Sequence, residues 1–555
     1  SCCRDVWLRQ DIMPLRSVAK SPPVADRPSA AASGMAKPKD GPEQSPVDYE
    51  ARADRMIHRW TQAQPPQAED PAGQSPVQQA QKPQPLRVTH NRASSSAASA
   101  AVQRVDRISR HVVMEQPREV PVLAECEVLV VGGGPAGLSA ALAARRAGAD
   151  VILCERYGCF GGVITTVGME TLGWYRYEGT VESPDGIGLE MERVASKMGG
   201  TTKWPYNDSA CLDADAFKIV ADRLVRDNGV RPLLHSTVVE AIVEDGVIRG
   251  VFTESKSGRR AILAKCVIDC TGDADVAHLA GADYTVCPKE ESLGVTAVFA
   301  ASGVNKDKFL EYSEKNPRTY KDWSRTWQQE GDGSGKEDQL RSPFLDTEFE
   351  EARKEGLIPD SETTRNLGGS WSALTEAGEA TNLNLVHLKG VDATDVEDLT
   401  RAEMQGREET IHAMTALRAK VPGFENAKLR NFGMTIGTRD SRKIVGRHNL
   451  TSEEVRGQAR FEDSIGIYPE FIDGYSILIL PTSGRYFQVP YGCLVPPQVD
   501  NLLVAGRCVA GDKTSHAATR NMMCCTITGQ GAGAAAAVAV RTNTSTLKVD
   551  IRLVQ

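Results

Sequence analysis

The stretch VLVVGGGPAGLSAALAARRAGADVILCER (128–156) places three consecutive glycines between a run of valines and a run of alanines. Glycine inside a helix or strand costs roughly 0.5–1 kcal/mol relative to alanine, so the glycines need a compensating role. Before them, CEVLVV (126–131) is a short apolar run typical of a buried parallel strand. After them, PAGLSAALAARRAG predicts a helix ending at Gly148, and ADVILCE predicts a second strand. The stretch therefore predicts a β-α-β unit.

The spacing of the glycines at the first turn of this unit predicts a dinucleotide site. The first glycine permits a tight turn, the second lets the backbone approach a pyrophosphate, and the third lets the helix pack closely on the strand. The phosphates then meet the free N–H groups and the positive end of the helix. An acid at the end of the second strand is placed to accept hydrogen bonds from a ribose. The residues predicted to make these contacts are Gly132, Gly134, Pro135, Ala136, Gly137, Glu155 and Arg156.

Length and composition limit the remaining possibilities. With 555 residues, 41% hydrophobic and 25% charged, the chain is long enough for two to four domains. A net charge of −8 without a sustained Lys/Arg block argues against a nucleic-acid partner. No run of eighteen apolar residues occurs, so we expect no membrane span, and GAGAAAAVAV (531–540) is interpreted as a core helix. The 13 cysteines form no C-x2-C pair, which predicts a reducing compartment, no disulfide framework and no metal site.

The first 118 residues differ in composition from the rest. They are rich in Pro, Ala, Ser and Gln and have almost no periodic apolar pattern, which predicts a disordered tail. A targeting extension is the alternative, because arginines and serines are scattered through the segment, although its aspartates weaken this interpretation. The localisation is therefore left open as a reducing intracellular compartment, cytoplasmic, or organellar (mitochondrion or plastid) if the tail is a targeting signal. The chain does not begin with Met, so its true start is also open.

Several segments, in a fixed order, resemble the FAD-dependent oxidoreductase family, which is distantly related to succinate dehydrogenase flavoproteins and heterodisulfide reductase flavin subunits. They are the glycine-rich stretch followed by YGCFGGVITT (157–166), AKCVIDCTGDADVAHLAGA (264–282), LRNFGMTIGTRDSRKIVGRHNLT (429–451) and NLLVAGRCVAGDKTSHAATRNMMCCTITGQGAGAAAAVA (501–539). The resemblance implies that the dinucleotide is FAD. It implies further cofactor contacts at Gly161, Gly162, Val238, Thr271, Gly272, Asp273, Gly506, Arg507, Asp512, Thr528, Gly529 and Gln530.

The expected fold is α/β, with a doubly wound Rossmann-like FAD-binding domain and an inserted α+β cap domain for the substrate. We place the FAD-binding domain at 119–282 and 430–549 and the cap at 283–429, with a contribution from 166–210. The insertions carry aromatic-rich segments, as a substrate-binding cap does in related flavoproteins. Residues 381–424 predict a strand, a turn and a long helix. Only one Gly-x-Gly-x-x-Gly occurs in a β-α-β setting, so no second site for NAD(P)H is expected.

Few polar residues are candidates for catalysis. Arg439 and Arg442 are candidates to clamp a carboxylate of an anionic substrate or to tune the flavin; the alternative is a structural ion pair with Asp440 or another acid. His516 is a candidate proton donor, with a structural role as the alternative. His387 is interpreted as a core residue. The pairs Cys154/Cys159 and Cys524/Cys525 are not interpreted as redox centres.

These features predict a soluble enzyme that transfers a hydride between a small-molecule substrate and flavin N5, with an unidentified electron acceptor. Two alternatives stay open. One is an electron-transferring flavin subunit that works only with partner proteins. The other is a degenerate flavoprotein with a structural role in a larger assembly. An oligomer or assembly is compatible with each of the three interpretations.

Overall fold

The glycine-rich stretch forms the predicted β-α-β unit in the computed structural model. It consists of β1 (Val122–Val131), α2 (Pro135–Arg146) and β2 (Val151–Cys154). The two strands pair in parallel, with Val128 opposite Val151 and Val131 opposite Cys154. The last four residues of β1 and all of β2 are buried, which explains why both strands are continuously apolar. β1 begins earlier than predicted because its first residues pair with another strand, β8.

The structure describes residues 117–172, 185–203, 210–318, 344–475, 477–480 and 485–555. All of them belong to one unit, Glu50–Gln555. The predicted tail lies outside the described residues except for its last two positions. Most of each aromatic-rich segment assigned to the cap also lies outside them (173–179, 204–208 and 320–329).

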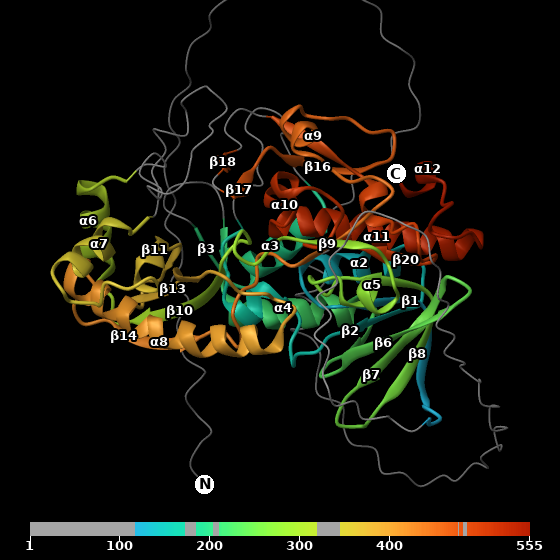
Figure 1. Cartoon of the computed structure of the whole chain (residues 1–555), viewed down its shortest axis with the longest axis horizontal. Helices are drawn as coiled ribbons and strands as arrows, with labels where there is room; N and C mark the ends of the chain where they lie inside the picture. Colours follow the sequence, from blue (N-terminus) through green and yellow to red (C-terminus); the bar gives the residue numbers. More distant parts are fainter. Residues whose placement is uncertain (1–116, 173–184, 204–209, 319–343, 476, 481–484) are drawn as a thin grey trace, which may run out of the picture. The chain divides into compact units, whose positions relative to one another are not determined.

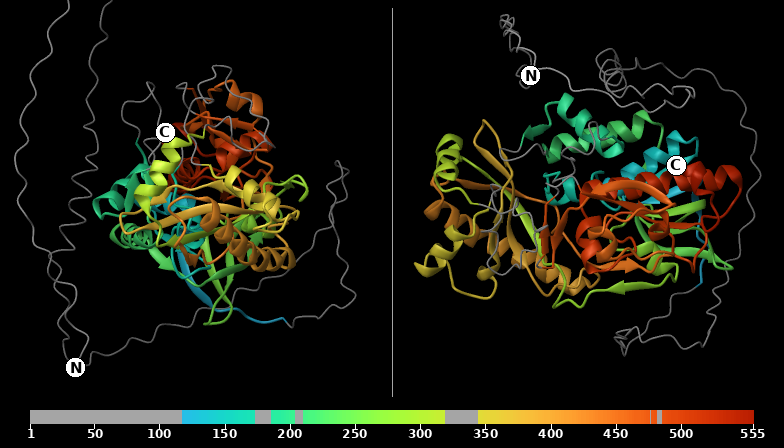
Figure 2. Two further views of the ribbon diagram at one scale, coloured as in Figure 1. Left: turned by 90° about the vertical axis from the view of Figure 1, so that its left-hand side faces the viewer. Right: turned by 90° about the horizontal axis from the view of Figure 1, so that it is seen from above.

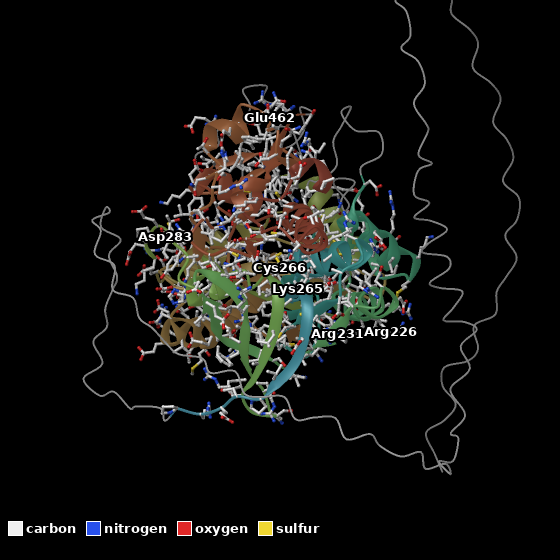
Figure 3. The ribbon with its side chains drawn as sticks, turned by 90° about the vertical axis from the view of Figure 1, so that its right-hand side faces the viewer. Arg226, Arg231, Lys265, Cys266, Asp283 and Glu462 are labelled. Atoms are coloured by element: carbon white, nitrogen blue, oxygen red, sulfur yellow. The ribbon has the colours of Figure 1, made fainter. Side chains whose placement is uncertain are left out.

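The β-α-β unit is part of a seven-stranded sheet with the strand order β5-β2-β1-β8-β7-β6, and β20 also pairs with β8 (Figure 1). The parallel pairs join β1, β2, β5, β8 and β20, whereas β7 is antiparallel to both β8 and β6. On β8, the side chains of neighbouring residues point to opposite faces, so that Lys265 reaches Glu127 at 3.2 Å while Cys266 is buried (Figure 3). The remaining strands are β5 (Arg231–Leu233), β6 (Thr237–Glu244), β7 (Val247–Glu254), β8 (Arg260–Asp269) and β20 (Leu502–Val504).

Two helices, one near the beginning and one near the end of the described chain, pack together beside this sheet. Helix α11 (Met522–Thr542), near the C-terminus, packs on α2, as the blue and red segments of Figures 1 and 2 show. A Cβ atom added at Gly529 or Gly533 would lie 2.1 Å from the carbonyl oxygen of Ala136 or Ala140. The small residues of α11 therefore permit close contact between two helices.

Helix α11 is long and apolar enough to cross a membrane, judged by length and composition alone. In this protein, 78% of its most apolar stretch is buried. This burial agrees with the interpretation of 531–540 as part of a core helix.

A second, five-stranded sheet has the order β11-β13-β10-β14, with β12 also paired to β13. All of its pairs are antiparallel. Helix α8 packs on it, and the apolar residues between them form a separate hydrophobic core drawn from 295–436. The strand, turn and long helix predicted within 381–424 are confirmed by β13 and α8. The elements are β10 (Val295–Ser302), α6 (Lys306–Lys315), α7 (Thr347–Lys354), η4 (Thr364–Asn366), β11 (Leu367–Ser370), β12 (Ala373–Leu374), β13 (Glu379–Leu388), α8 (Val396–Lys420) and β14 (Lys428–Phe432).

The other described elements connect or flank the two sheets. They include four two-stranded ribbons, which pair β3 with β4, β9 with β15, β16 with β19 and β17 with β18. Their bounds are η1 (Val163–Val167), α3 (Ile187–Lys197), β3 (Thr201–Lys203), β4 (Ala210–Leu212), α4 (Ala214–Asp227), α5 (Asp275–Leu279), β9 (Tyr284–Val286), β15 (Arg442–Ile444), α9 (Ser452–Arg456), β16 (Ser464–Pro469), β17 (Ile472–Gly474), β18 (Ile477–Ile479), β19 (Tyr486–Pro490), η5 (Tyr491–Leu494), α10 (Lys513–Thr519) and α12 (Ile551–Val554).

Candidate functional site

The turn between β1 and α2 has the geometry of a phosphate cradle. A Cβ atom at Gly132 would lie 2.3 Å from the carbonyl oxygen of Cys270, and one at Gly137 would lie 1.7 Å from that of Gly132. These two glycines are therefore required by packing within the protein. A Cβ atom at Gly134 would meet nothing closer than 3.7 Å, and this residue borders a cavity. The backbone at Gly134 is thus open to a ligand at the N-terminus of α2.

Glu155 follows β2 and lies beside this turn. One of its carboxylate oxygens accepts a hydrogen bond from the Gly133 N–H at 2.6 Å, and the other accepts one from the Tyr157 N–H at 2.9 Å. The side chain is buried and lines the cavity. Each carboxylate oxygen has a second lone pair, so Glu155 can fix the glycine turn and still accept hydrogen bonds from a ribose.

A second glycine pair packs against the first turn. Gly162 has a φ of +53°, and a Cβ atom there would lie 2.6 Å from the Gly134 Cα atom. The Gly161 N–H donates to the Gly133 carbonyl at 2.8 Å. A single π-helical turn, η1, follows directly and lines the cavity. Short π-helical turns are uncommon and occur frequently at functional sites.

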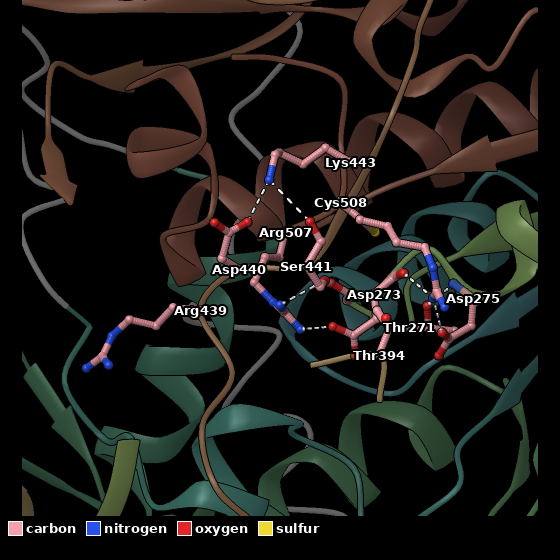
Figure 4. A network of polar contacts seen from close by, with 12 residues as sticks. Thr271, Asp273, Asp275, Thr394, Arg439, Asp440, Ser441, Lys443, Arg507 and Cys508 are labelled. Carbon is pink, nitrogen blue, oxygen red and sulfur yellow. Dashed lines mark hydrogen bonds and ion pairs between the residues drawn. The ribbon is translucent and has the colours of Figure 1, made fainter. Parts of the chain in front are cut away.

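The turn after β8 is held by buried carboxylates and arginines (Figure 4). Asp269 accepts hydrogen bonds from the Thr271 N–H at 3.0 Å and from its hydroxyl at 2.7 Å, and burial raises the pKa of Asp269 to about 6. Arg507 donates to Asp273 at 2.7 Å. Arg442 donates to Asp275 at 2.9 Å. The loop 271–273 is therefore fixed in place by contacts from β8, β15 and the turn after β20.

The turns after β1, β2 and β8 border one cavity of about 400 Å³. Its other end is bordered by the five-stranded sheet and by the first turn of α11. The cavity thus extends from the dinucleotide turn to the sheet that the sequence assigned to the cap. The predicted cofactor residues that line it are Gly132, Gly134, Pro135, Ala136, Glu155, Arg156, Gly162, Val238, Thr271, Gly272, Asp273, Gly506 and Arg507.

Six other predicted cofactor residues do not line the cavity. Asp512 caps α10 by accepting from the Ser515 N–H at 2.8 Å. The Thr528 hydroxyl accepts from the Gly506 N–H at 2.9 Å, so Thr528 supports the turn after β20. The remaining four pack on neighbouring backbone or side-chain atoms, or bond to a backbone N–H. These four are Gly137, Gly161, Gly529 and Gln530.

Of the three predicted catalytic residues, the structure places one against the cavity. Arg439 lines it, whereas Arg442 and His516 do not. Arg442 has the structural ion pair that was the alternative interpretation, although its partner is Asp275 and not Asp440. In Figure 4 Arg439 points away from the network that contains Asp440 and Arg507.

The environment of His516 does not suit a proton donor. Its Nε2 donates to the Arg439 carbonyl at 3.0 Å, and its Nδ1 has no hydrogen-bond partner among the described residues. Burial, and then the charge of Lys443, lower the pKa of His516 to about 3, so the ring is neutral at pH 7. Lys443 itself is held by Asp440 at 2.6 Å. His516 therefore belongs to a buried structural network behind Arg439.

Arg439 is a half-buried cation with neutral partners. Its guanidinium donates to the Gly294 carbonyl at 2.6 Å and to the Asn384 side-chain oxygen at 3.2 Å. Among the described residues, no carboxylate lies within ion-pair distance of it. Burial, and then the charge of Arg520, lower the pKa of Arg439 to about 10. Arg520 also lines the cavity and pairs with Asp473 at 3.4 Å.

The sequence did not reveal the polar face of the five-stranded sheet. In β13 the segment TNLNL (381–385) alternates, so Leu383 and Leu385 enter the hydrophobic core while Asn382 and Asn384 line the cavity. This alternation of Asn and Leu was the sequence signal that could have revealed the polar face. Three other polar residues of the sheet region share this face: Thr296, Ser370 and Ser372. His387, interpreted as a core residue, accepts or donates a hydrogen bond with Thr296 at 3.3 Å.

The cysteines of the described chain are all free. Burial raises the pKa of Cys154 and of Cys525 to about 12, so both remain protonated thiols at neutral pH. Within the described ranges, no group of three or more His, Cys, Asp or Glu residues is arranged to hold a metal ion.

Comparison with known proteins supplies the family. A family model described as FAD dependent oxidoreductase matches residues 127–555. A thiamine thiazole synthase from Methanococcus aeolicus is 31% identical over 181 residues, which make up 31% of this chain and 62% of that protein. A 6-methylpretetramide 4-monooxygenase from Streptomyces rimosus is 33% identical over 186 residues, or 30% of this chain and 44% of that protein. The chain thus matches less than two thirds of the length of these curated relatives.

Among solved structures, a geranylgeranyl bacteriochlorophyll reductase-like protein from Thermoplasma acidophilum is 13% identical. That alignment covers 78% of this chain and 82% of the other, with a TM-score of 0.37. The p-nitrophenol 4-monooxygenase from Pseudomonas putida is 12% identical over 75% of this chain and 79% of its own, also with a TM-score of 0.37.

Proposed function

This chain belongs to the FAD-dependent oxidoreductase family, and from that premise we propose that it transfers a hydride between a carbon atom of a small organic anion and FAD. The cofactor is FAD, and the protein is an enzyme. The identity of the substrate, the direction of the hydride transfer and the electron acceptor belong to the proposal. The observation that carries it is the half-buried guanidinium of Arg439 in the cavity, without a carboxylate partner among the described residues.

The glycine turn fits the cofactor because Gly134 borders the cavity and a Cβ atom there would meet nothing closer than 3.7 Å. We propose that the N–H groups at the start of α2 hold the pyrophosphate and that Glu155 holds the ribose. Arg507 and Asp273 keep the neighbouring loop in place through their 2.7 Å ion pair. When bound, FAD supplies the hydride-transfer chemistry that no amino-acid side chain provides.

The opposite end of the cavity suits a small anionic substrate. Transfer of a charged group from water to a protein interior is unfavourable unless the charge is paired. Arg439 makes hydrogen bonds to neutral groups only, the Gly294 carbonyl, the Asn384 amide and the His387 ring, so a bound carboxylate would neutralise its charge. Apolar residues at the same end, including Ile436, Phe471 and Met522, would exclude water from the reacting atoms.

The anion-binding part of the proposal is tested by spectroscopy of the FAD-loaded protein. We expect propionate to perturb the visible spectrum of the bound flavin, and an Arg439→Lys variant to require about tenfold more propionate, because lysine lacks the planar fork. Arg442→Lys is the matched control, since Arg442 does not line the cavity and is paired with Asp275. It should leave the propionate response unchanged. Equal responses in the wild type and the Arg439 variant would contradict the proposal.

The redox part is tested separately by anaerobic mixing with a panel of small organic acids. A substrate should bleach the oxidised flavin absorption without added reductant. Bleaching by neutral alcohols or amines of similar size, with no response to any acid, would contradict an anionic substrate.

A further inference from the structure

Three polar side chains from distant parts of the chain form a hydrogen-bond relay on the cavity face of the five-stranded sheet. The Asn382 amide nitrogen donates to the Thr171 hydroxyl at 2.6 Å and also to the Ser372 hydroxyl. The Thr171 hydroxyl donates to the Ser372 hydroxyl at 2.5 Å. All three residues line the cavity, and Asn382 and Ser372 are almost completely buried.

Counting donors and acceptors shows which hydrogen the relay leaves without an acceptor. The two hydrogens of the Asn382 amide are used on Thr171 and Ser372, and the hydrogen of Thr171 is used on Ser372. The Ser372 oxygen thus accepts two hydrogen bonds, and its own hydrogen has no acceptor in the described part of the chain. The Asn382 side-chain oxygen is likewise buried without a hydrogen-bond partner there. A buried donor without an acceptor is unfavourable, so a ligand acceptor at Ser372 would be stabilising.

The relay also strengthens Ser372 as a donor. In a chain of hydrogen bonds each bond polarises the next, so a hydroxyl that accepts two bonds donates a third more strongly. The Ser372 carbonyl is itself occupied by the Cys211 thiol at 3.5 Å, which helps to fix the residue. The donor is therefore both oriented and polarised before a ligand arrives.

The donor is separate from the proposed anion site but close to it. Arg439 contacts Asn384, which follows Asn382 by two residues on β13. Two residues along a strand span roughly 7 Å. A ligand held at Arg439 by its carboxylate could therefore place a second oxygen atom, several bonds away, at the Ser372 hydroxyl.

We propose that Ser372 is a specificity-determining residue that donates a hydrogen bond to a second, carbonyl-type oxygen of the substrate. The substrate class is accordingly a small oxo acid, with a carboxylate at Arg439 and a keto oxygen at Ser372, and this class rests on the proposed function of Arg439. Thr171 and Asn382 act as positioning residues, because they hold the Ser372 oxygen and do not donate to the ligand.

The test compares two acids that differ in one oxygen function, pentanoate and 4-oxopentanoate, by titration calorimetry of the FAD-loaded protein. The wild type should bind the oxo acid about tenfold more tightly than pentanoate, as expected for one hydrogen bond from an oriented donor. In Ser372→Ala the two acids should bind equally, with the pentanoate affinity unchanged. Ser372→Cys retains a weaker donor and should give an intermediate preference.

Ser302→Ala is the matched control, because it removes a serine hydroxyl from β10 of the same sheet outside the cavity lining. It should keep the tenfold preference. FAD content and melting temperature of each variant report on folding. A preference retained in Ser372→Ala, or absent from the wild type, would overturn the inference.

Arg439→Lys distinguishes the two proposals. If both hold, this variant weakens both acids to the same extent and keeps the preference for the oxo acid. If both acids bind the variant as tightly as they bind the wild type, the anion site fails. A preference for the oxo acid that still depends on Ser372 would then support the Ser372 donor alone.

Discussion

At the scale of single residues, two glycines beside α2 differ in the atoms that a side chain added there would contact. Gly134 is the N-cap of α2, and Gly529 lies on α11. At Gly134 a Cβ atom has open space toward the cavity, whereas at Gly529 it would lie 2.1 Å from the Ala136 carbonyl oxygen. A valine at position 134 would therefore occupy the space of a ligand, and an alanine at 529 would force two helices apart. The same type of residue thus serves cofactor binding at one position and packing at the other.

We expect Gly134→Val to abolish FAD binding almost completely and to leave the melting temperature of the FAD-free protein nearly unchanged. Gly529→Ala should do the reverse: overpacking of about 1–3 kcal/mol should lower the melting temperature by several degrees while FAD is still bound. Absorbance at the flavin maximum and thermal unfolding measure the two effects. A Gly134→Val protein that purifies with a full complement of FAD would show that the pyrophosphate does not approach this turn.

Glu170 gives a pH-dependent prediction. It is buried, accepts hydrogen bonds from the Ala214 N–H at 3.1 Å and the Thr381 hydroxyl at 2.5 Å, and burial raises its pKa to about 7. The folded protein therefore keeps this proton up to about pH 7, whereas the unfolded chain loses it near pH 4.5. The contribution of Glu170 to stability is greatest below pH 4.5 and declines as the pH rises to about 7.

A Glu170→Gln variant removes this titration and retains a hydrogen-bonding amide. Relative to the wild type, it should gain stability as the pH rises from 4.5 to 7, by about 3 kcal/mol in total for the shift of pKa. Denaturant unfolding at pH 4.5 and pH 8 measures the change. Glu408→Gln on an exposed position of α8 is the control and should show no such difference. Parallel stability curves for the wild type and Glu170→Gln would mean that Glu170 is ionised in the folded protein.

At the scale of elements, α11 is the helix that joins the cavity to the core. Its N-cap is Asn521, and no side chain caps the N–H groups of its first turn. Asn521, Met522 and Cys525 line the cavity, so the positive end of a 21-residue helix faces it. The cofactor contacts predicted at Thr528, Gly529 and Gln530 lie six or more residues after this end, because the helix begins at Met522.

We expect this helix end to raise the reduction potential of bound FAD, because reduction adds negative charge to the flavin. Asn521→Asp would place a carboxylate at the N-cap and oppose that effect. An interaction of 0.3–1 kcal/mol corresponds to roughly 6–20 mV for a two-electron couple, so the potential should fall by at least this amount. Asn543→Asp makes the same change at the C-cap of α11 and is the control. Equal potentials in the wild type and Asn521→Asp would mean that the flavin ring lies away from this turn.

At the scale of the whole molecule, the sequence predicted the structural features that depend on residues close together in the chain. The β-α-β unit, its glycine turn and Glu155 lie within one short segment, and their pattern reports local geometry directly. The relay could not be predicted in this way, because Thr171 is 201 residues from Ser372 and 211 from Asn382. Which of the two arginines in GTRDSR reaches the cavity also depends on tertiary contacts, since Arg442 pairs with an acid 167 residues away.

The composition of the first 118 residues supports a prediction about the whole chain. This segment is rich in Pro, Ala, Ser and Gln and lacks periodic apolar residues, so it has little surface to bury against a folded domain. The buried residues of the two largest hydrophobic cores of the described chain all lie at position 126 or later. Stability and cofactor binding should therefore depend on the residues that follow the segment.

Deletion of residues 1–110 should leave the FAD content unchanged and the melting temperature within about 2 °C of the full chain, since less than about 1 kcal/mol of packing is removed. A shorter deletion, of residues 1–60, is the matched control and should behave identically. The measurements are flavin absorbance per protein and thermal unfolding at equal concentration. A fall in either quantity for the longer deletion alone would locate a stabilising contact between residues 61 and 110, and the predicted start of the folded body at Glu119 would then be too late.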